Sequence, residues 1–238
     1  MDEIITPKTN GQTVSSDTAE RDMTPLFADK KYSTRLLIVR HGESLANAKG
    51  IFLGHTDLGL SERGFLQAAA TAEYLKDEPI SAAYSSDLCR AFDTAKEIAR
   101  YHSLEVTPMK ELREIYIGKW ENSVIAEIER DYGEIFTVGW KKNFGFFTPP
   151  EGEPIPDAAK RFHDVLLTIA KRHEGECVLI GAHAAVIRAF FGRLLDIAPE
   201  RVTAEIDFPY NASVSTVYFD GEKLIAGEFS HSAHLLGI

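Results

Sequence analysis

Histidine, arginine and carboxylate side chains stand at the ends of several short apolar runs in this chain. Arg40 and His41 close the first run, and Arg90, Glu114 and His183 follow later ones. A phosphate dianion is bound best by cationic donors, and arginine offers a rigid fork of N–H groups. A neutral imidazole can attack phosphorus, and a carboxylic acid can protonate the leaving oxygen. The residue types therefore indicate phosphoryl transfer.

Three small residues close to these side chains suit a phosphate site. Gly42 has no side chain, so we expect it to let the backbone approach a ligand closely. Ser44 and Ala184 are expected to open helices, and the N-terminus of a helix attracts anions. These positions favour anion binding at the same strand ends.

These side chains meet only if the strands run parallel, since the carboxyl ends of parallel strands lie at the same edge of the sheet. Ligands of open α/β sheets bind beyond that edge. Apolar runs with β-branched residues predict strands at 34–40, 80–84, 104–107 and 177–181. Helical spacing predicts helices at 61–76, 87–99, 122–131, 157–170 and 184–195. Asp87 and Asp157 are the expected caps of two of these helices. Asp220-Gly221, between runs 213–219 and 223–227, indicates a hairpin.

This alternation predicts an α/β fold of three layers, with a mostly parallel mixed sheet and an antiparallel C-terminal edge. Residues 1–31 are polar and lack an apolar period, which predicts a flexible N-terminal arm. One catalytic domain is expected over 32–238. Within it, the glycines and prolines of 133–156 predict an irregular, lid-like excursion.

The composition excludes several classes of protein. The 238 residues carry 26 Lys and Arg against 36 Asp and Glu, a formal net charge of −10, so we expect no nucleic-acid partner. No apolar run reaches the roughly 18 residues of a membrane helix, and the N-terminal residues do not resemble a signal peptide. The two cysteines argue against a disulfide scaffold. A cytoplasmic protein without a membrane partner is expected.

Five ordered motifs then resemble the histidine phosphatase superfamily, the phosphoglycerate-mutase-like fold, in its phosphatase branch. They are Arg40-His41-Gly42-Glu43-Ser44 with Asn47; Phe52–Asp57 with Leu60–Gly64; Ser85–Ala91; Leu112–Glu114 with Gly118–Glu121; and Gly181–His183 with Val186–Arg188. The motifs keep the family's order and cover about residues 34–220.

The resemblance implies a role for each matching residue. His41 is the implied nucleophile, which forms a phosphohistidine, and Glu114 is the implied proton donor to the leaving group. Arg40, Arg90 and a cationic His183 are implied to clamp the phosphoryl oxygens, helped by the phosphate-binding residues Ser44 and Asn47. Because arginines and histidine supply the positive charge, the resemblance implies no metal and no cofactor. Ala184 departs from the glycine that the family usually has after the second histidine, so the pocket floor is expected to be tighter.

Several alternatives stay open from the sequence. Glu111 is the rival of Glu114 as the acid, and Ser44 is alternatively only a helix cap. Five aromatic residues of the excursion form either its own core or a substrate wall: Phe136, Trp140, Phe144, Phe146 and Phe147. The leading function is a phosphomonoester hydrolase acting on a small phosphorylated substrate. A phosphoglycerate-mutase-type phosphotransferase and an inactive phosphate-binding module are the alternatives. The substrate and the oligomeric state are not predicted.

Overall fold

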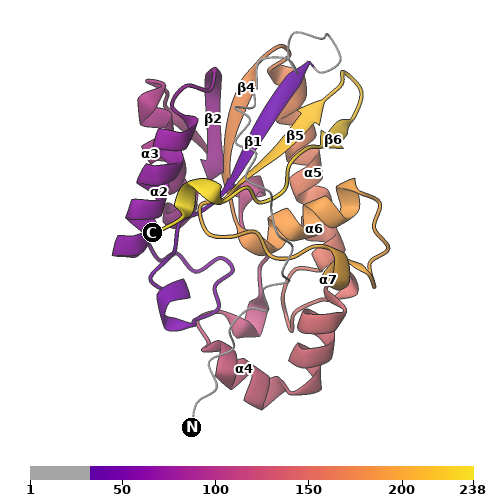
Figure 1. Ribbon diagram of the computed structural model, residues 1–238. Coiled ribbons are helices and arrows are strands. Elements are labelled where there is room, and N and C mark those ends of the chain that lie inside the picture. Colours follow the sequence, from indigo (N-terminus) through magenta and orange to yellow (C-terminus); the bar gives the residue numbers. More distant parts are fainter. Residues whose placement is uncertain (1–32) are drawn as a thin grey trace, which may run out of the picture.

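The computed structural model describes residues 33–238 (Figure 1), so the arm predicted over 1–31 lies outside the described residues. A six-stranded sheet has the order β3-β2-β4-β1-β5-β6. Its strands are β1 (Thr34–Arg40), β2 (Ile80–Ser86), β3 (Val106–Met109), β4 (Cys177–Ala182), β5 (Val214–Phe219) and β6 (Leu224–Ala226). The first four strands pair in parallel, whereas β5 pairs antiparallel with β1 and with β6. The predicted mixed sheet and its antiparallel C-terminal edge are confirmed.

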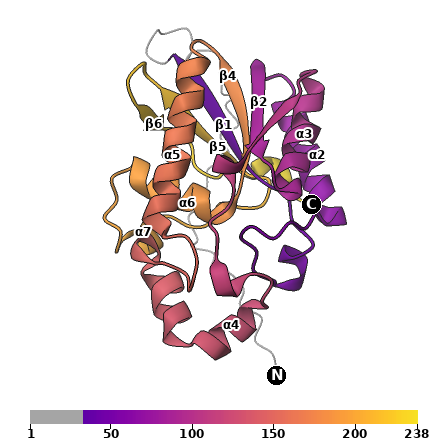
Figure 2. The ribbon, with the colours of Figure 1, turned by 180° about the vertical axis from the view of Figure 1, so that it is seen from behind.

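Helices cover both faces of this sheet, so the predicted three layers are also confirmed. Figures 1 and 2 show α2 and α3 on one side of the sheet and α5 and α6 on the other. The helices are α2 (Glu62–Leu75), α3 (Cys89–Tyr101), α4 (Ile125–Tyr132), α5 (Ile155–Arg172), α6 (Ala184–Leu194) and α7 (Val202–Glu205). Helix α4 and the segment that follows it lie beyond one end of the sheet, at the bottom of Figure 1.

Alternating residues of the central strand β1 divide the apolar interior into two cores. Leu36 and Ile38 belong to the larger core under α5 and α6, whereas Leu37 and Val39 belong to the smaller core under α2 and α3. Side chains of a strand point alternately to opposite faces, so a run of consecutive apolar residues is what a strand buried on both faces requires.

Two predicted helix caps are wrong. Helix α3 begins after Leu88 instead of Asp87, because the Ser86 hydroxyl accepts the Leu88 N–H and the Asp87 carboxylate pairs with Arg113. Helix α5 begins at Ile155, two residues before Asp157, and has Pro156 in its first turn, where the missing N–H costs nothing. The Ser61 hydroxyl does cap α2, since it accepts the Gly64 N–H at 3.0 Å.

The 133–156 excursion is more regular than its glycines and prolines suggest. Residues Ile135–Trp140 form a π-helical segment and Phe144–Phe146 a 3-10 turn. Phe136, Trp140 and Phe144 are buried and extend the larger core, where Trp140 and Phe144 meet edge to face. Aromatic burial therefore overrides the local loop signal in this segment.

The hairpin predicted at Asp220-Gly221 is present between β5 and β6. The Asp220 carboxylate accepts the N–H groups of Glu222 and Lys223, and Gly221 takes a positive φ of 99°. Within residues 33–238, no helix is long and apolar enough to cross a membrane.

Candidate active site

A cavity of about 250 Å³ opens at the carboxyl ends of β1 and β4, where the sequence places its polar side chains. Its lining includes six of the seven predicted site residues: Arg40, His41, Ser44, Asn47, Arg90 and Glu114. The seventh, His183, is fully buried beside it, with its ring centre 5.2 Å from that of His41. A larger cavity of about 500 Å³ between α5, α6 and 196–202 contains none of these residues.

His41 follows β1 directly and has one ring nitrogen engaged by the backbone. Its Nδ1 lies 2.7 Å from the Gly42 carbonyl oxygen, which accepts a hydrogen bond and so places the ring proton on Nδ1. The lone pair of Nε2 is therefore available for attack. Burial, with further contributions from Arg90 and Arg40, holds the pKa of His41 well below its usual 6.5. The imidazole is thus neutral, which a nucleophile requires.

His183 is the N-cap residue of α6, and its ring is fully buried. Neither ring nitrogen has a hydrogen-bond partner among residues 33–238. Burial, and then the charge of Arg90, hold its pKa well below the usual 6.5. His183 is therefore neutral in the unliganded protein, and the cationic ring implied by the resemblance stays a prediction for the phosphate-bound state. A neutral ring still offers one N–H donor.

Two arginines reach the cavity from different elements, Arg40 from the end of β1 and Arg90 from the first turn of α3. The backbone carbonyls of Gly54 and Thr56 accept hydrogen bonds from Arg90 at 2.8 and 2.9 Å, which fixes its guanidinium plane. Arg40 donates to the Pro209 carbonyl at 2.5 Å, whereas its Nε is buried without a partner among the described residues. Burial lowers the pKa of Arg40 to about 10, so it remains charged at neutral pH.

Glu114 presents its carboxylate to the N-terminus of α6. Its two oxygens accept the N–H groups of Ala185 at 3.0 Å and Val186 at 2.8 Å, and Oε1 also accepts the Ile115 N–H. The group bound at this helix N-terminus is therefore the protein's own carboxyl group, where we had expected the phosphate. Because Glu114 lines the cavity and Glu111 does not, the geometry favours Glu114 over its rival.

Ser44 and Asn47 form a reciprocal turn at the cavity mouth. The Ser44 hydroxyl accepts the Asn47 N–H, and the Asn47 side-chain oxygen accepts the Ser44 N–H, both at 3.1 Å. The helix that Ser44 was expected to open is a single 3-10 turn, Asn47–Lys49. With its oxygen engaged, the Asn47 amide has its Nδ2 as the donor for a ligand.

Asn211 is a site residue that the sequence motifs do not reveal. Its Nδ2 donates to the His41 carbonyl at 3.1 Å and to the Asn47 side-chain oxygen at 3.3 Å. The next residue, Ala212, has a positive φ of 58° although it is not glycine, and its N–H donates to the Arg40 carbonyl. Such strain persists only where the surroundings impose it. Nothing in the local sequence indicates this contact.

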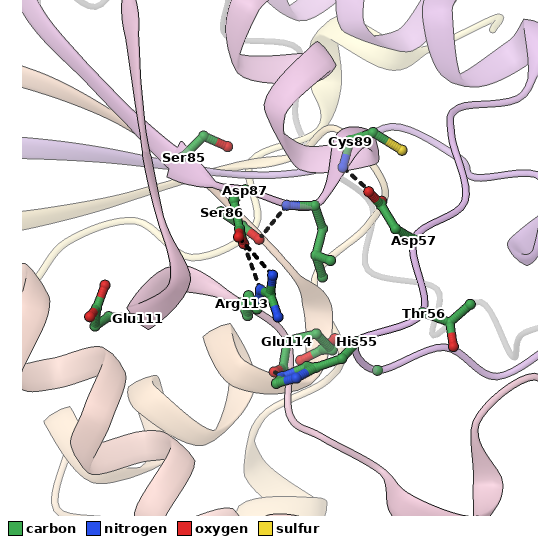
Figure 3. A network of polar contacts seen from close by, with 12 residues as sticks. His55, Thr56, Asp57, Ser85, Ser86, Asp87, Cys89, Glu111, Arg113 and Glu114 are labelled. Atoms are coloured by element: carbon green, nitrogen blue, oxygen red, sulfur yellow. Dashed lines mark hydrogen bonds and ion pairs between the residues drawn. The ribbon is translucent and has the colours of Figure 1, made fainter.

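A network of polar contacts connects the loop that binds Arg90, the start of α3 and the segment around Glu114. Figure 3 shows side chains of this network. Asp57 accepts the Cys89 N–H at the start of α3, which anchors the loop whose carbonyls grip Arg90. The Asp87 carboxylate accepts hydrogen bonds from Nε and Nη2 of Arg113, at 2.6 and 2.7 Å, and Arg113 directly precedes Glu114 in the chain. The His55 ring lies 2.8 Å from the Glu114 carbonyl oxygen. The second, third and fourth motifs therefore support one another physically.

Gly42 does not serve the role expected of it. A Cβ at Gly42 would lie 2.4 Å from the Gly64 carbonyl oxygen, and a Cβ at Gly64 would lie 2.0 Å from the Glu43 carbonyl oxygen. These glycines allow the loop after β1 to pack against the first turn of α2, and the close approach is between two backbones. Ala184 is accommodated as the first residue of α6, and it lines the cavity.

Metal ligation finds no support in the side-chain arrangement of the described part of the chain. Among residues 33–238, no three His, Cys, Asp or Glu side chains are grouped so that they could hold a metal ion. Cys89 is half-buried, and burial raises the pKa of its thiol to about 11, which disfavours the nucleophilic thiolate.

Comparison with known proteins agrees with this fold. The family model of the histidine phosphatase superfamily (branch 1) matches residues 36–229. A metal-independent phosphoserine phosphatase of Arabidopsis thaliana is 34% identical over 207 residues, which cover 86% of this chain and 84% of that protein. A 2,3-bisphosphoglycerate-dependent phosphoglycerate mutase of Gloeobacter violaceus is 33% identical over 73% of this chain and 81% of its own length.

Among solved structures, Bacillus stearothermophilus YhfR has a TM-score of 0.80 at 27% identity, and covers 85% of this chain and 100% of its own. A mycobacterial glucosyl-3-phosphoglycerate phosphatase bound to VO3 has a TM-score of 0.75 at 27% identity, with 83% and 99% of the two chains covered. The chain belongs to the histidine phosphatase superfamily. Its fold is the phosphoglycerate-mutase-like α/β sandwich.

Proposed function

We propose that this protein is a phosphatase that hydrolyses small phosphomonoesters through a phosphohistidine on His41, without a metal ion. Arg40, Arg90 and His183 bind the phosphoryl oxygens, with Asn47 and Ser44 at the cavity mouth. Glu114 donates a proton to the leaving oxygen and later takes a proton from the attacking water. We call the group Arg40, His41, Arg90, Glu114 and His183 the phosphate end of the cavity.

The reaction proceeds in two balanced steps. In the first, the lone pair of His41 Nε2 attacks phosphorus, the bond from phosphorus to the ester oxygen breaks, and protonated Glu114 gives its proton to that oxygen. In the second, Glu114 takes a proton from water, whose oxygen attacks phosphorus while the bond to Nε2 breaks. An alcohol and inorganic phosphate leave, and both residues return to their first state.

The observation that carries this proposal is a set of buried polar atoms close to the nucleophile that lack partners in the described part of the chain. Arg40 Nε and both ring nitrogens of His183 are buried without partners among residues 33–238, beside two guanidinium groups and a neutral nucleophile. Arg40 Nε and the one N–H of the neutral His183 ring are thus buried donors unpaired by any described residue, which is costly, so a site that collects them is built for an acceptor. A phosphoryl group has oxygens enough to satisfy them. The names of the relatives, which include phosphoserine phosphatases, support hydrolysis.

We also propose that the 133–156 excursion shapes substrate choice, because Trp140 on it lines the cavity while none of the phosphate-end residues belongs to it.

The test is to trap the intermediate. Wild-type protein in EDTA is mixed with p-nitrophenyl phosphate, quenched, and analysed for phosphate on the His41 peptide by mass spectrometry under conditions that preserve phosphohistidine. We expect a phosphopeptide in the wild type and none in His41→Asn, with turnover unaffected by EDTA. Phosphate found on another residue, or turnover that needs added Mg²⁺ or Zn²⁺, would overturn the mechanism.

A further inference from the structure

Beyond the phosphate end, the cavity wall is apolar. Apart from Ser44 and Asn47 at the mouth, its remaining lining has no charged side chain; it includes Ile51, Phe52, Leu53, Ile125, Trp140 and Phe208. Four of these, Phe52, Ile125, Trp140 and Phe208, also line an adjoining outer cavity of about 410 Å³. We call the space bounded by these four residues the apolar chamber. A substrate whose phosphate lies on His41 must place its leaving group there.

Three of the four chamber residues are aromatic, and their rings pack against one another. The Trp140 and Phe208 rings are nearly parallel, at 16° and 6.2 Å between centres, and Phe52 meets Trp140 edge to face at 4.9 Å. Trp140 is buried in the larger core, so its position does not depend on a ligand. Such walls gain free energy by covering apolar groups.

The two cations of the outer cavity are already engaged. Lys141 donates to both oxygens of Glu129, at 3.0 and 2.9 Å. Arg188 donates to the carbonyls of Ile206 and Thr203, and its guanidinium lies over the Phe208 ring at 4.3 Å. A third charged residue there, Asp207, is acidic. The charges around the outer cavity therefore balance in pairs, Lys141 with Glu129 and Arg188 with Asp207, and offer no net positive charge to a carboxylate on the leaving group.

From this arrangement we infer that the substrate's leaving group is an apolar, uncharged alcohol, aromatic or alkyl, with no carboxylate or second phosphate. This inference rests on the proposed phosphatase function. It separates the chain from the acidic compounds in its relatives' names, phosphoserine and phosphoglycerate. The phosphate end fixes the reaction, and the apolar chamber selects the alcohol.

A homologous series of esters tests the inference. Wild-type protein is assayed with ethyl, propyl and butyl phosphate, with O-phosphoserine and with 3-phosphoglycerate. Each buried methylene should raise kcat/KM roughly fourfold, so butyl phosphate should exceed ethyl phosphate by about tenfold or more. Butyl phosphate should also exceed both carboxylates. Equal rates along the series, or a preference for either carboxylate, would overturn the inference.

A charge placed in the chamber sharpens the test. Ile125 is 39% exposed and lines both cavities, so Ile125→Lys adds a cation there at little risk to folding. This variant should lower kcat/KM for butyl phosphate and raise it for phosphoserine, shifting their ratio by at least about tenfold. Phe146→Lys is the control, because Phe146 is 61% exposed on the neighbouring 133–156 excursion and lines neither cavity. An unchanged ratio in Ile125→Lys, or an equal shift in Phe146→Lys, would contradict the chamber.

Assays with p-nitrophenyl phosphate distinguish failure of the chamber inference from failure of the proposed phosphatase function. If that ester is hydrolysed but the series shows no preference for butyl over charged leaving groups, the chamber inference fails alone. If none of these esters releases inorganic phosphate, the proposed phosphatase function fails and the inference falls with it.

Discussion

The phosphate end and the apolar chamber meet in one cavity but are built in opposite ways. At the phosphate end, residues at strand ends and helix starts point charged groups inward, and backbone carbonyls and amides fix them, as Gly54 and Thr56 fix Arg90. In the chamber, aromatic rings form most of the lining, and the nearby charges of Lys141 and Arg188 are balanced by Glu129 and Asp207. The chemistry and the selectivity therefore rest on different interactions, and substitutions should separate them.

Loss of the nucleophile should have the largest effect. His41→Ala removes the atom that accepts the phosphoryl group, so turnover of every ester should fall by at least about 10⁴-fold, whatever the leaving group. Steady-state rates on p-nitrophenyl and butyl phosphate measure this. Retention of more than about one per cent of the wild-type rate would show that the phosphate end does not act covalently through His41.

The role of Glu114 as the proton donor can be tested by comparing esters whose leaving groups differ in their need for a proton. Glu114→Gln removes the transferable proton, so butyl phosphate turnover should fall by about 10²-fold or more. The kcat/KM of p-nitrophenyl phosphate, which reports only the first step, should fall only a few-fold, because its leaving group needs little protonation. The kcat/KM of butyl phosphate should fall by the larger factor. Glu111→Gln is the matched control, and both of its rates should stay near wild type. Equal damage to both esters in Glu114→Gln would assign Glu114 a structural role, through its bonds to α6.

The sequence was sufficient for β1, β2 and β4 because their signals are local, whereas β3 lies at Val106–Met109, two residues later than predicted, and includes Pro108. Consecutive apolar residues mark the strands buried on both faces, and Arg40, His41 and His183 stand where such runs end. Asn211 could not be found in this way, since its bond to His41 spans 170 positions and depends on a strained Ala212. The chamber likewise joins Phe52, Trp140 and Phe208, whose meeting is a product of tertiary packing.

Asn211 should act as a positioning residue of the phosphate end. Asn211→Ala removes the donor to the His41 carbonyl and the Asn47 amide, so kcat should fall about five- to tenfold, the cost of roughly one hydrogen bond. The inhibition constant of inorganic phosphate should rise with it, because Asn47 loses its orientation. Tyr210→Ala, at an exposed neighbouring side chain, should change neither. A lower melting temperature with unchanged kcat and phosphate inhibition would contradict the positioning role.

Lowering the pH should reduce the free energy of unfolding through the histidines of the phosphate end, whereas the chamber residues do not titrate. This is the smallest effect we predict. His41 and His183 have pKa values well below 6.5 when folded, chiefly because burial disfavours the charged ring. Their contribution is therefore complete above about pH 6.5 and is lost as pH falls below it, because only the unfolded chain then binds the protons.

Between pH 7 and pH 5, each such histidine costs up to about 2 kcal/mol of the free energy of unfolding. His41→Asn removes one of them, so its melting temperature should fall less than that of the wild type over this interval, by roughly 2–4 °C for each kcal/mol. Thermal unfolding followed by circular dichroism at the two pH values measures the difference. Asn47→Ala, a non-titrating change in the same cavity, should keep the wild-type response. If His41→Asn loses as much on acidification as the wild type does, His41 is protonated in the folded protein at pH 5, and the neutral nucleophile that the burial of the phosphate end implies does not exist there.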